Sequence, residues 1–313
     1  MAQGRVLVVA ATHGNERNAP WLLEHWRQQP ELLARHGLEL QLVLGHPQAL
    51  AANTRYLDRD LNRSFSLELL ADASRQEQEI QRARALLAAH GPDGTSPCAV
   101  VFDLHSTTSA MGNSLVVYGR RPADLALAAG IQARLGLPVY LHEADPVQTG
   151  FLVERWPCGL VIEVGPVPQG LVSAPICRQT QLALEAGLDT VAAAAAGRLR
   201  LPRALTLHVH AGSVDLPRRP DGTPASALHP RRQHRDWQPL EAGDPLFWSP
   251  DGGTQGFVAA DQWDPAARWP VFINEAAYGE KGIAFSLTRR ERLPCEDAWA
   301  EALTQLAQRG VPL

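Results

Sequence analysis

The chain has 313 residues, of which 45% are hydrophobic and 20% charged, and its formal net charge is -4. This length suffices for about two domains with buried cores. The ordinary composition excludes a disordered, collagen-like or disulfide-scaffold protein. Because there is no basic excess, we expect neither nucleic acid nor an anionic membrane as a partner.

The cysteines and the apolar runs indicate the cellular location of the protein. Its four cysteines contain no C-x-x-C pair and no metal-ligand spacing, which is typical of a reduced cytosolic protein: Cys98, Cys158, Cys177 and Cys295. The N-terminal apolar run over 6–11 is far shorter than a membrane span. We therefore expect a cytoplasmic location, with no transmembrane or targeting segment.

The first two thirds of the chain alternate between apolar runs and helical periodicity. The unbroken run over 5–11 predicts a strand that is covered on both faces. Further strands are predicted over 39–45, 99–105, 114–118, 138–142 and 159–165, and helices over 20–35, 76–90, 123–135 and 176–198. Strands that alternate with helices favour an α/β fold with a mainly parallel mixed sheet and flanking helices.

The composition and the hydrophobic periodicity of the sequence change after residue 197. Proline and glycine become frequent, apolar runs shorten, and helical periodicity returns only over 295–309. Turn signals at 219–222, 242–244 and 250–253 separate short strand candidates. We therefore expect a first domain over residues 1–202 and a smaller, β-rich C-terminal domain over residues 203–313.

Potential metal ligands follow three of the predicted strands. His13 and Glu16 follow the first strand, His105 ends the strand over 99–105, and Glu163 lies near the end of the strand over 159–165. In open α/β sheets, ligands bind at the carboxyl ends of the strands. Two histidines and one carboxylate with an open fourth position are typical of a hydrolytic zinc site. The conjunction of these residues at strand ends favours a metal centre.

Each of these residues also has a structural interpretation when it is taken alone. A histidine after a strand is usually a hydrogen-bonded loop residue, and H-x-x-E occurs by chance. Asp103 points to the same side of its strand as His105, so it either orients the ring or caps the next turn. Glu163 lies inside an apolar strand, where an unpaired buried carboxylate is costly, unless the strand is an edge that faces water.

A fourth cluster lies over residues 54–63. It holds three arginines, two aspartates and an asparagine within ten residues. Guanidinium groups bind carboxylates through paired hydrogen bonds, so such a segment beside a metal indicates an anionic substrate. The alternative is a solvated surface loop with internal ion pairs.

Five motifs in order give the chain a family resemblance. They are His13-Gly-Asn-Glu16, Arg55-Tyr-Leu-Asp-Arg-Asp-Leu-Asn-Arg63, Phe102-Asp-Leu-His-Ser-Thr-Thr108, Ile162-Glu-Val-Gly-Pro-Val-Pro-Gln-Gly170 and Val271-Phe-Ile-Asn-Glu-Ala-Ala-Tyr278. Together they resemble the motifs of aspartoacylase and its mercapturate-deacylating aminoacylase relative. The wider family includes succinylglutamate desuccinylase, and its catalytic domain is similar to that of zinc carboxypeptidases.

The resemblance implies a role for each matching residue. It implies one zinc ion per chain, bound by His13, Glu16 and His105. It makes Glu163 the general base and acid, which activates the attacking water and protonates the leaving amine. Arg55 is then expected to stabilise the oxyanion, and the substrate-binding residues are expected to be Asn62, Arg63 and Tyr278. The implied partner is a small-molecule N-acyl amino acid, and the sequence leaves the question of a homo-oligomer open.

Several other functions fit the sequence less well. A serine hydrolase lacks its G-x-S-x-G motif here, and no glycine-rich phosphate loop follows the first strand. A binding protein that has lost its chemistry has no need of Glu163 as a base. A desuccinylase of N-succinyl amino acids remains the nearest alternative among enzymes.

Two departures from the aspartoacylase pattern concern the substrate side chain. Enzymes specific for N-acetyl-aspartate resemble one another in an arginine upstream of the Ile-Glu-Val-Gly-Pro motif and a second cation after the Glu-Lys pair. In this chain the first position falls in the stretch 150–153, which has no arginine, and the second is Gly282. Arg155 lies close to the first position. Lys281 is the only lysine among 29 basic residues, which suggests a positional role or chance retention. We therefore expect uncharged, including aromatic, side chains to be accepted.

Overall fold

The strand β1 (Val6–Ala10) is buried on both faces, as its unbroken apolar run predicts. The computed structural model describes residues 4–34, 36–143, 148–258, 264 and 266–308. In it, Val6, Val8 and Ala10 pack into one hydrophobic cluster, whereas Leu7 and Val9 pack into another. A strand with apolar neighbours on both faces therefore lies at the centre of a layered α/β fold.

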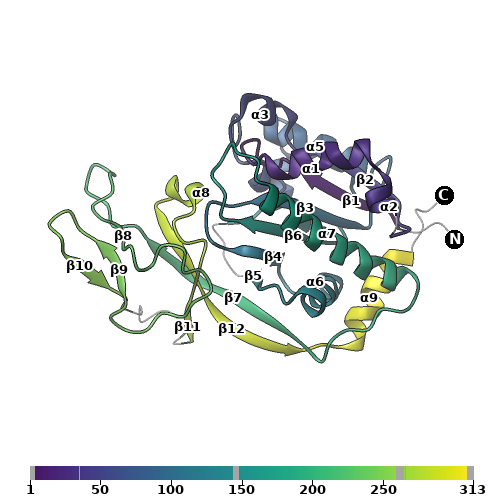
Figure 1. Ribbon diagram of the computed structural model, residues 1–313. Coiled ribbons are helices and arrows are strands. Elements are labelled where there is room, and N and C mark those ends of the chain that lie inside the picture. The colour runs from purple at the N-terminus through teal and green to yellow at the C-terminus, as the bar shows by residue number, and fades with distance from the viewer. Residues whose placement is uncertain (1–3, 35, 144–147, 259–263, 265, 309–313) are drawn as a thin grey trace.

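Within the described residues, nine strands form one mixed sheet (Figure 1). In spatial order they are β11 (Ala267–Val271), β12 (Ile283–Pro294), β7 (Ala204–Asp215), β5 (Val139–His142), β4 (Gly112–Tyr118), β6 (Cys158–Gly165), β3 (Val100–Ser106), β1 and β2 (Leu40–Leu44). The strands β2, β1, β3 and β6 are parallel, β4 runs antiparallel to β6, and β5 is parallel to both β4 and β7. The predicted mainly parallel mixed sheet is confirmed.

Helices cover both faces of this sheet. The first hydrophobic cluster contains residues of α1 (Asn18–Gln28), α6 (Pro122–Leu135), α7 (Ala174–Ala195) and α9 (Asp297–Gln308). On the opposite face, α5 (Gln78–His90) contributes to the second cluster. Short helical turns complete the fold: α2 (Glu31–Ala34), α3 (Pro47–Ala52), η1 (Leu61–Arg63), α4 (Leu67–Ala71), η2 (Leu152–Arg155) and α8 (Ala276–Gly279).

The predicted helix over 20–35 is interrupted at residues 29–30 and forms two helices. The helix α1 ends at Gln28 and α2 begins at Glu31, because Pro30 lacks an amide donor and disfavours helix in the residue before it. The last residue of that prediction, and that of the helix over 295–309, lie outside the described residues. None of the helices in the described ranges is both long and apolar enough to span a membrane.

The β-rich part of the chain is continuous with the main sheet. The strands β7 and β12 pair along their length, and β7 joins the sheet beside β5. At the far end, β8 (Ala227–Leu228), β9 (Pro245–Trp248) and β10 (Thr254–Gly256) form a small antiparallel sheet (Figure 1). Residues of β9 share a third apolar cluster with β11 and β12. The helix α9 then returns to pack on α6 and α7. The sequence division at residue 202 falls just before β7 and stays a prediction.

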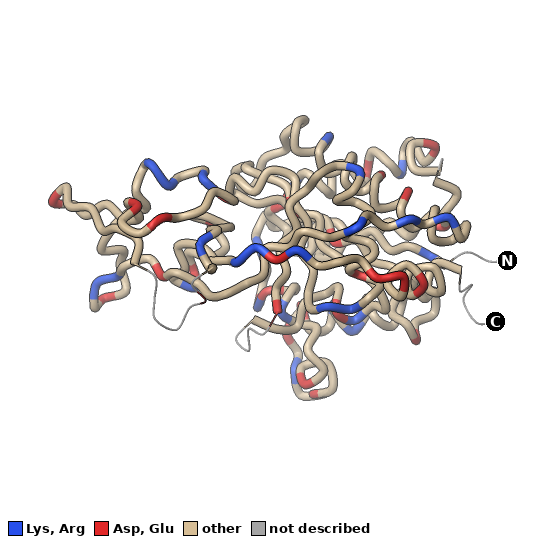
Figure 2. Tube along the Cα trace, turned by 90° about the horizontal axis from the view of Figure 1, so that it is seen from below, with Lys and Arg blue, Asp and Glu red and all other residues tan. Residues whose placement is uncertain are grey.

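Charged residues of both signs are interspersed along the chain (Figure 2). The end of β12 is an example, because Glu291 lies among arginines and forms ion pairs with Arg120 and Arg289. The arginine-rich composition is therefore balanced locally by carboxylates in this part of the surface.

Candidate active site

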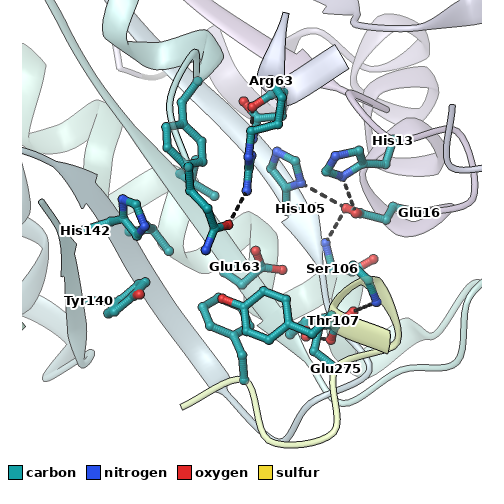
Figure 3. Close-up of a pocket in the computed structure, with 18 of the residues that line it drawn as sticks. His13, Glu16, Arg63, His105, Ser106, Thr107, Tyr140, His142, Glu163 and Glu275 are labelled. Atoms are coloured by element: carbon teal, nitrogen blue, oxygen red, sulfur yellow. Dashed lines mark hydrogen bonds and ion pairs between the residues drawn. The ribbon is translucent and has the colours of Figure 1, made fainter. Parts of the chain in front are cut away.

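The sheet topology brings the predicted site residues together at one edge (Figure 3). Because β1, β3 and β6 are adjacent and parallel, their carboxyl ends meet. The register of β3 against β6 sets His105 directly opposite Glu163. The strand β6 lies between β4 and β3, so Glu163 is not on an edge strand that faces water. Its side chain instead faces a pocket that His13 and Glu16 also line.

Two histidines and one carboxylate converge at this edge. His13 Nδ1 lies 2.6 Å from Glu16 Oε1, and His105 Nδ1 lies 3.2 Å from Glu16 Oε2. One potential ligand atom from each residue falls within 4.8 Å of the others, and all three side chains are buried. The amide of Ser106 donates to Glu16 Oε2 at 2.8 Å and fixes the carboxylate. This donor set fits zinc, which prefers histidine nitrogen and carboxylate oxygen.

A carboxylate holds the far nitrogen of each histidine. His105 Nε2 donates to Asp103 Oδ2 at 2.8 Å, and Thr12 Oγ1 donates to the other oxygen of Asp103 at 2.6 Å. His13 Nε2 lies 2.9 Å from Asp60 Oδ1 and 2.9 Å from Arg55 Nη2. When its only proton is on Nε2, the His105 ring keeps Nδ1 as an acceptor for a metal. The orienting role of Asp103 is confirmed, whereas the contact of Asp60 was missed because it comes from a distant loop.

Burial and charge shift the pKa values of this group in opposite directions. Burial raises the pKa of Glu16, but His105 and His13 outweigh it and hold the pKa well below its usual range. Burial lowers the pKa of His105, but Asp103 and Glu16 raise it well above its ordinary value. Burial raises the pKa of Glu163 far above that of a free carboxyl, with Glu16 and Glu275 adding to the effect against His105. Glu163 is therefore the carboxyl that most readily carries a proton here.

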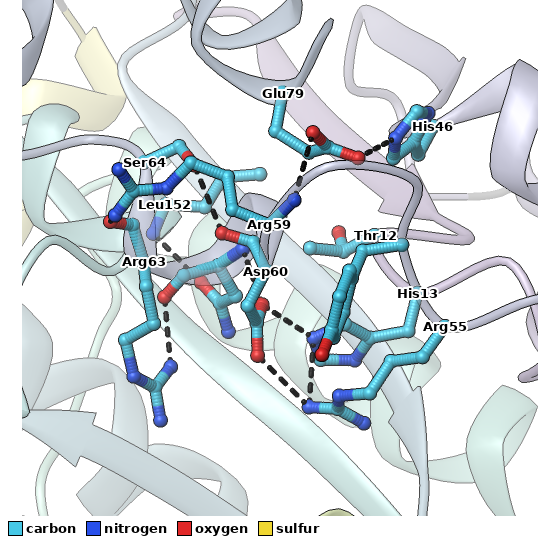
Figure 4. Close-up of polar contacts among 12 residues, drawn as sticks. Thr12, His13, His46, Arg55, Arg59, Asp60, Arg63, Ser64, Glu79 and Leu152 are labelled. Atoms are coloured by element: carbon cyan, nitrogen blue, oxygen red, sulfur yellow. Dashed lines mark hydrogen bonds and ion pairs between the residues drawn. The ribbon is translucent and has the colours of Figure 1, made fainter. Parts of the chain in front are cut away.

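The predicted anion-binding cluster folds against the same pocket (Figure 4). Arg55 forms ion pairs with Asp60 at 3.3 Å and with Glu16 at 3.5 Å. Asn62 accepts a hydrogen bond from the amide of Leu152 at 2.8 Å, which leaves its side-chain nitrogen available to a ligand. Arg63 donates to Gln148 Oε1 at 3.0 Å, and its guanidinium lies 4.0 Å from the ring centre of Phe151. The cluster is not a freely solvated loop.

The pocket encloses about 610 Å³ of empty space, part of it open to solvent. All eight residues that the sequence singled out line it: His13, Glu16, Arg55, Asn62, Arg63, His105, Glu163 and Tyr278. Tyr278 is partly buried, its hydroxyl lies 3.2 Å from Ser286 Oγ, and desolvation raises its pKa to about 12. Tyr140 and His142 lie across the pocket from His13 and Glu16 (Figure 3). Their rings contact one another and those of Phe151 and Phe272, and Phe151 stacks on Tyr118, so this wall of the pocket is mainly aromatic. Sequence reasoning missed this wall because its members are scattered over four segments.

Glu275 was also missed, although it lies within a quoted motif. Its Oε2 accepts hydrogen bonds from the amide of Thr108 at 2.8 Å, from that of Ser109 at 3.2 Å and from the hydroxyls of Thr107, Thr108 and Ser109. Its Oε1 accepts from the amide of Ala277 at the start of α8. One carboxylate thus ties the segment after β3 to the segment that carries Tyr278.

Three more polar residues have structural contacts: His208, His210 and Lys281. His208 packs edge-on against Trp237 and Trp269, and His210 accepts from or donates to Tyr140 Oη at 2.8 Å. Within the described residues, neither histidine belongs to a group that could hold a metal. Lys281 donates to Gln148 Oε1 at 3.2 Å, next to the bond from Arg63. Arg155 is not among the described residues that line the pocket.

Comparison with known families gives two matches that together span most of the chain. Residues 2–191 match the succinylglutamate desuccinylase/aspartoacylase catalytic domain. Residues 203–290 match the AstE/AspA barrel-sandwich hybrid domain. The second match covers the segment that contributes Phe272, Glu275 and Tyr278 to the pocket.

Individual proteins agree with these matches. A probable aspartoacylase of Parasynechococcus marenigrum is 59% identical over 306 residues, which cover 98% of this chain and 99% of the relative. One from Prochlorococcus marinus (strain MIT 9313) is 57% identical, over 96% and 98% of the two chains. The crystal structure of murine aminoacylase 3 superimposes with a TM-score of 0.83 at 33% identity, and covers 94% of this chain and 98% of its own. The chain therefore belongs to the succinylglutamate desuccinylase/aspartoacylase family, and it is a hydrolase of the aspartoacylase/aminoacylase type.

Proposed function

We propose that this protein is a zinc-dependent enzyme that hydrolyses N-acyl-L-amino acids to a free amino acid and a carboxylate. We assign one zinc per chain to His13, Glu16 and His105. The observation that carries the proposal is the convergence of this ligand set with Glu163 and two arginines in one pocket. Hydrolysis of an amide needs a metal or other electrophile, a proton carrier and an anion-binding group. Glu163 is the proton carrier, the arginines bind the anion, and the two histidines with Glu16 are the metal ligands.

The chain's own groups divide the reaction between them. Bound zinc supplies Lewis acidity and lowers the pKa of water to about 7. Glu163 takes a proton from the attacking water and returns it to the amine nitrogen as the amide bond breaks. Its raised pKa suits the second of these tasks. Arg55, held by Asp60 and Glu16, donates hydrogen bonds to the acyl oxygen as negative charge develops there.

The substrate's amino-acid end binds beside the catalytic group. Arg63 and the side-chain amide nitrogen of Asn62 hold the α-carboxylate by charge-assisted hydrogen bonds. Phe151 and Gln148 fix the guanidinium of Arg63 before the substrate arrives, which lowers the entropic cost of binding. Tyr278 borders the pocket from the C-terminal part of the chain and limits the access of water.

We infer that the side-chain subsite favours uncharged and aromatic groups. The wall across from the metal ligands is aromatic. Phe151 lies in the stretch 150–153, where enzymes specific for N-acetyl-aspartate are expected to have an arginine that binds the substrate's side-chain carboxylate. A second substrate carboxylate without a partner in this partly dry pocket costs a few kcal/mol of binding free energy. N-acetyl-tyrosine should therefore be hydrolysed at least comparably to N-acetyl-aspartate.

A profile of initial rates tests the proposal. Zinc-loaded enzyme is assayed with N-acetyl-aspartate, N-acetyl-tyrosine and N-succinyl-glutamate, and the products are identified. If N-acetyl-aspartate exceeds N-acetyl-tyrosine by about 10³-fold in kcat/KM, a discrimination of about 4 kcal/mol, the side-chain inference is refuted. Preference for N-succinyl-glutamate indicates a desuccinylase, and zinc binding without any hydrolysis indicates a binding protein.

Domain organisation and location complete the proposal. We infer a catalytic domain over residues 1–202 and a β-rich domain over residues 203–313 that contributes to the site, which the two family matches support. We infer a cytoplasmic location because all four cysteines are free thiols, as expected in a reducing compartment.

A further inference from the structure

The loop over residues 55–63 carries Arg55, Asn62 and Arg63, and it has no regular structure before the single helical turn of η1. A loop of this kind depends on neighbouring elements for its conformation. Glu79 lies next to this loop, in the first turn of α5, with a side chain that is completely buried (Figure 4). Glu79 is not among the pocket-lining residues, so it touches no substrate.

The Glu79 carboxylate binds three consecutive amides of the loop. The amide of Leu57 donates to Oε1 at 2.7 Å, and the amides of Asp58 and Arg59 each donate to Oε2 at 3.2 Å. Successive amides that converge on one anion form a concave cradle that fixes the backbone conformation. In return, Asp58 Oδ2 accepts from the amide of Gln78 at 2.8 Å, so the loop caps the helix that holds it.

His46 holds Glu79 from the other side. His46 Nε2 donates to Glu79 Oε1 at 2.7 Å, and both side chains have no exposed surface. The other ring nitrogen accepts from the amide of Ala49 at 3.4 Å and caps α3, which requires the proton to be on Nε2. Burial raises the pKa of Glu79, but the bonds from His46 and the loop amides outweigh it and keep the carboxylate charged.

The same pair reaches the metal-binding loop through α3. A Cβ on Gly14 would lie 2.0 Å from the carbonyl carbon of Ala49, so α3 packs directly on the turn between His13 and Glu16. The amide of Gly14 also donates to the carbonyl of Arg55 at 3.2 Å. The helix that His46 caps thus contacts one active-site loop while Glu79 holds the other.

We propose that the buried Glu79–His46 pair is a positioning device that sets the conformation of the substrate-binding loop over residues 55–63. The proposal rests on the function proposed above. A displacement of about 1 Å in Arg55 or Arg63 is enough to lower the rate of the reaction substantially, because their charges act only at the correct geometry. Glu79 and His46 therefore affect the reaction through the loop and without contact with the substrate.

The test compares Glu79→Gln with two matched variants. Glu77→Gln removes a neighbouring carboxylate that forms its ion pair with Arg75. Ile80→Val trims a buried apolar side chain of the same helix and lowers stability without removing a hydrogen bond to the loop. In the zinc-loaded proteins, zinc content, kcat and KM for N-acetyl-tyrosine, and hydrogen exchange of peptides over 54–63 are measured.

We expect Glu79→Gln to keep its zinc, to lose about 10- to 100-fold in kcat/KM with a raised KM, and to exchange faster over 54–63. Glu77→Gln and Ile80→Val should match the wild type in both readouts. If Glu79→Gln does not fold, His46→Gln takes its place, with the same changes expected at about 3- to 10-fold.

Two results would overturn the proposal. One is hydrogen exchange over 54–63 that is unchanged in Glu79→Gln. The other is faster hydrogen exchange in Glu79→Gln with a kcat/KM no lower than that of Ile80→Val. The exchange measurement needs no turnover. If the wild-type enzyme is inactive on N-acyl amino acids, this result contradicts the proposed function, and the exchange measurement still tests whether Glu79 positions the loop.

Discussion

Replacing Glu163 by Gln tests the assigned proton carrier with little change of shape. The side chain lies on a central strand, opposite His105, in a pocket wall that the backbone of β6 holds rigidly. Glutamine keeps the length and planarity of glutamate but cannot accept a proton from water. Burial and the nearby Glu16 and Glu275 raise the pKa of the native carboxyl, so a neutral amide removes an unfavourable charge. We therefore expect no loss of thermal stability.

The magnitude follows from the chemical role. General acid and base catalysis contributes about 10²- to 10⁴-fold, which is about 2.7 to 5.4 kcal/mol in the activation free energy. Because Glu163 is not assigned to bind the substrate, the loss should appear in kcat and leave KM within about threefold. Zinc content should stay at one per chain, since the three ligands are intact.

The assay measures amine release from N-acetyl-tyrosine together with zinc by elemental analysis and the melting temperature. Glu241→Gln is the matched control, because it removes an exposed carboxylate that pairs with Arg268 on the surface. A Glu163→Gln enzyme with kcat within a factor of three of the wild type would refute the assignment. Loss of zinc in this variant would instead make Glu163 a metal ligand.

Three further predictions concern other parts of the site. His105→Ala should lose both zinc and activity, and full zinc occupancy in that variant would contradict the ligand set. Lys281→Arg should raise KM about 3- to 10-fold, because a longer cation displaces Gln148 from Arg63; unchanged kinetics and melting temperature would favour chance retention. Burial raises the pKa of Asp236 from 3.8 to about 6, so its contribution to stability is fully present below pH 3.8 and is lost as pH rises through 6. Asp236→Asn should therefore be more stable than the wild type at pH 7 by about 3 kcal/mol or less and show a flatter dependence on pH, whereas parallel pH curves from denaturant titrations would contradict the shift.

Most strands and helices could be predicted because their periodicity reflects local burial. The run before His13 alternates between two cores and so contains no polar residue, which is the pattern of a central parallel strand. The direction of β4 could not be predicted, because hydrophobic alternation is the same in parallel and antiparallel pairs. The break at Pro30 was readable but was outweighed by the apolar periodicity on both sides of it.

The metal ligands could be predicted because they follow strands that the fold rules bring to one edge. Glu275 and Asp60 could not, since each reaches the site from a loop whose path depends on tertiary contacts. Asp60 meets His13 across 47 positions, and Glu275 meets Thr107 across 168. A carboxylate in a loop has the same local pattern whether it binds solvent or a distant side chain. Such contacts become visible only when the loop conformation is known.

The site is built across the sequence division at residue 202, and this has a physical consequence for the two halves. The N-terminal part supplies the metal ligands, while Phe272, Glu275 and Tyr278 come from the C-terminal part. The hydrogen bonds of Glu275 with Thr107, Thr108 and Ser109 tie the two parts directly beside the pocket. A chain that ended at 202 would expose the edge of β5, where β7 pairs, and would remove one wall of the pocket. The C-terminal part therefore completes both the sheet and the active site, which explains physically why the two family domains occur together in this chain.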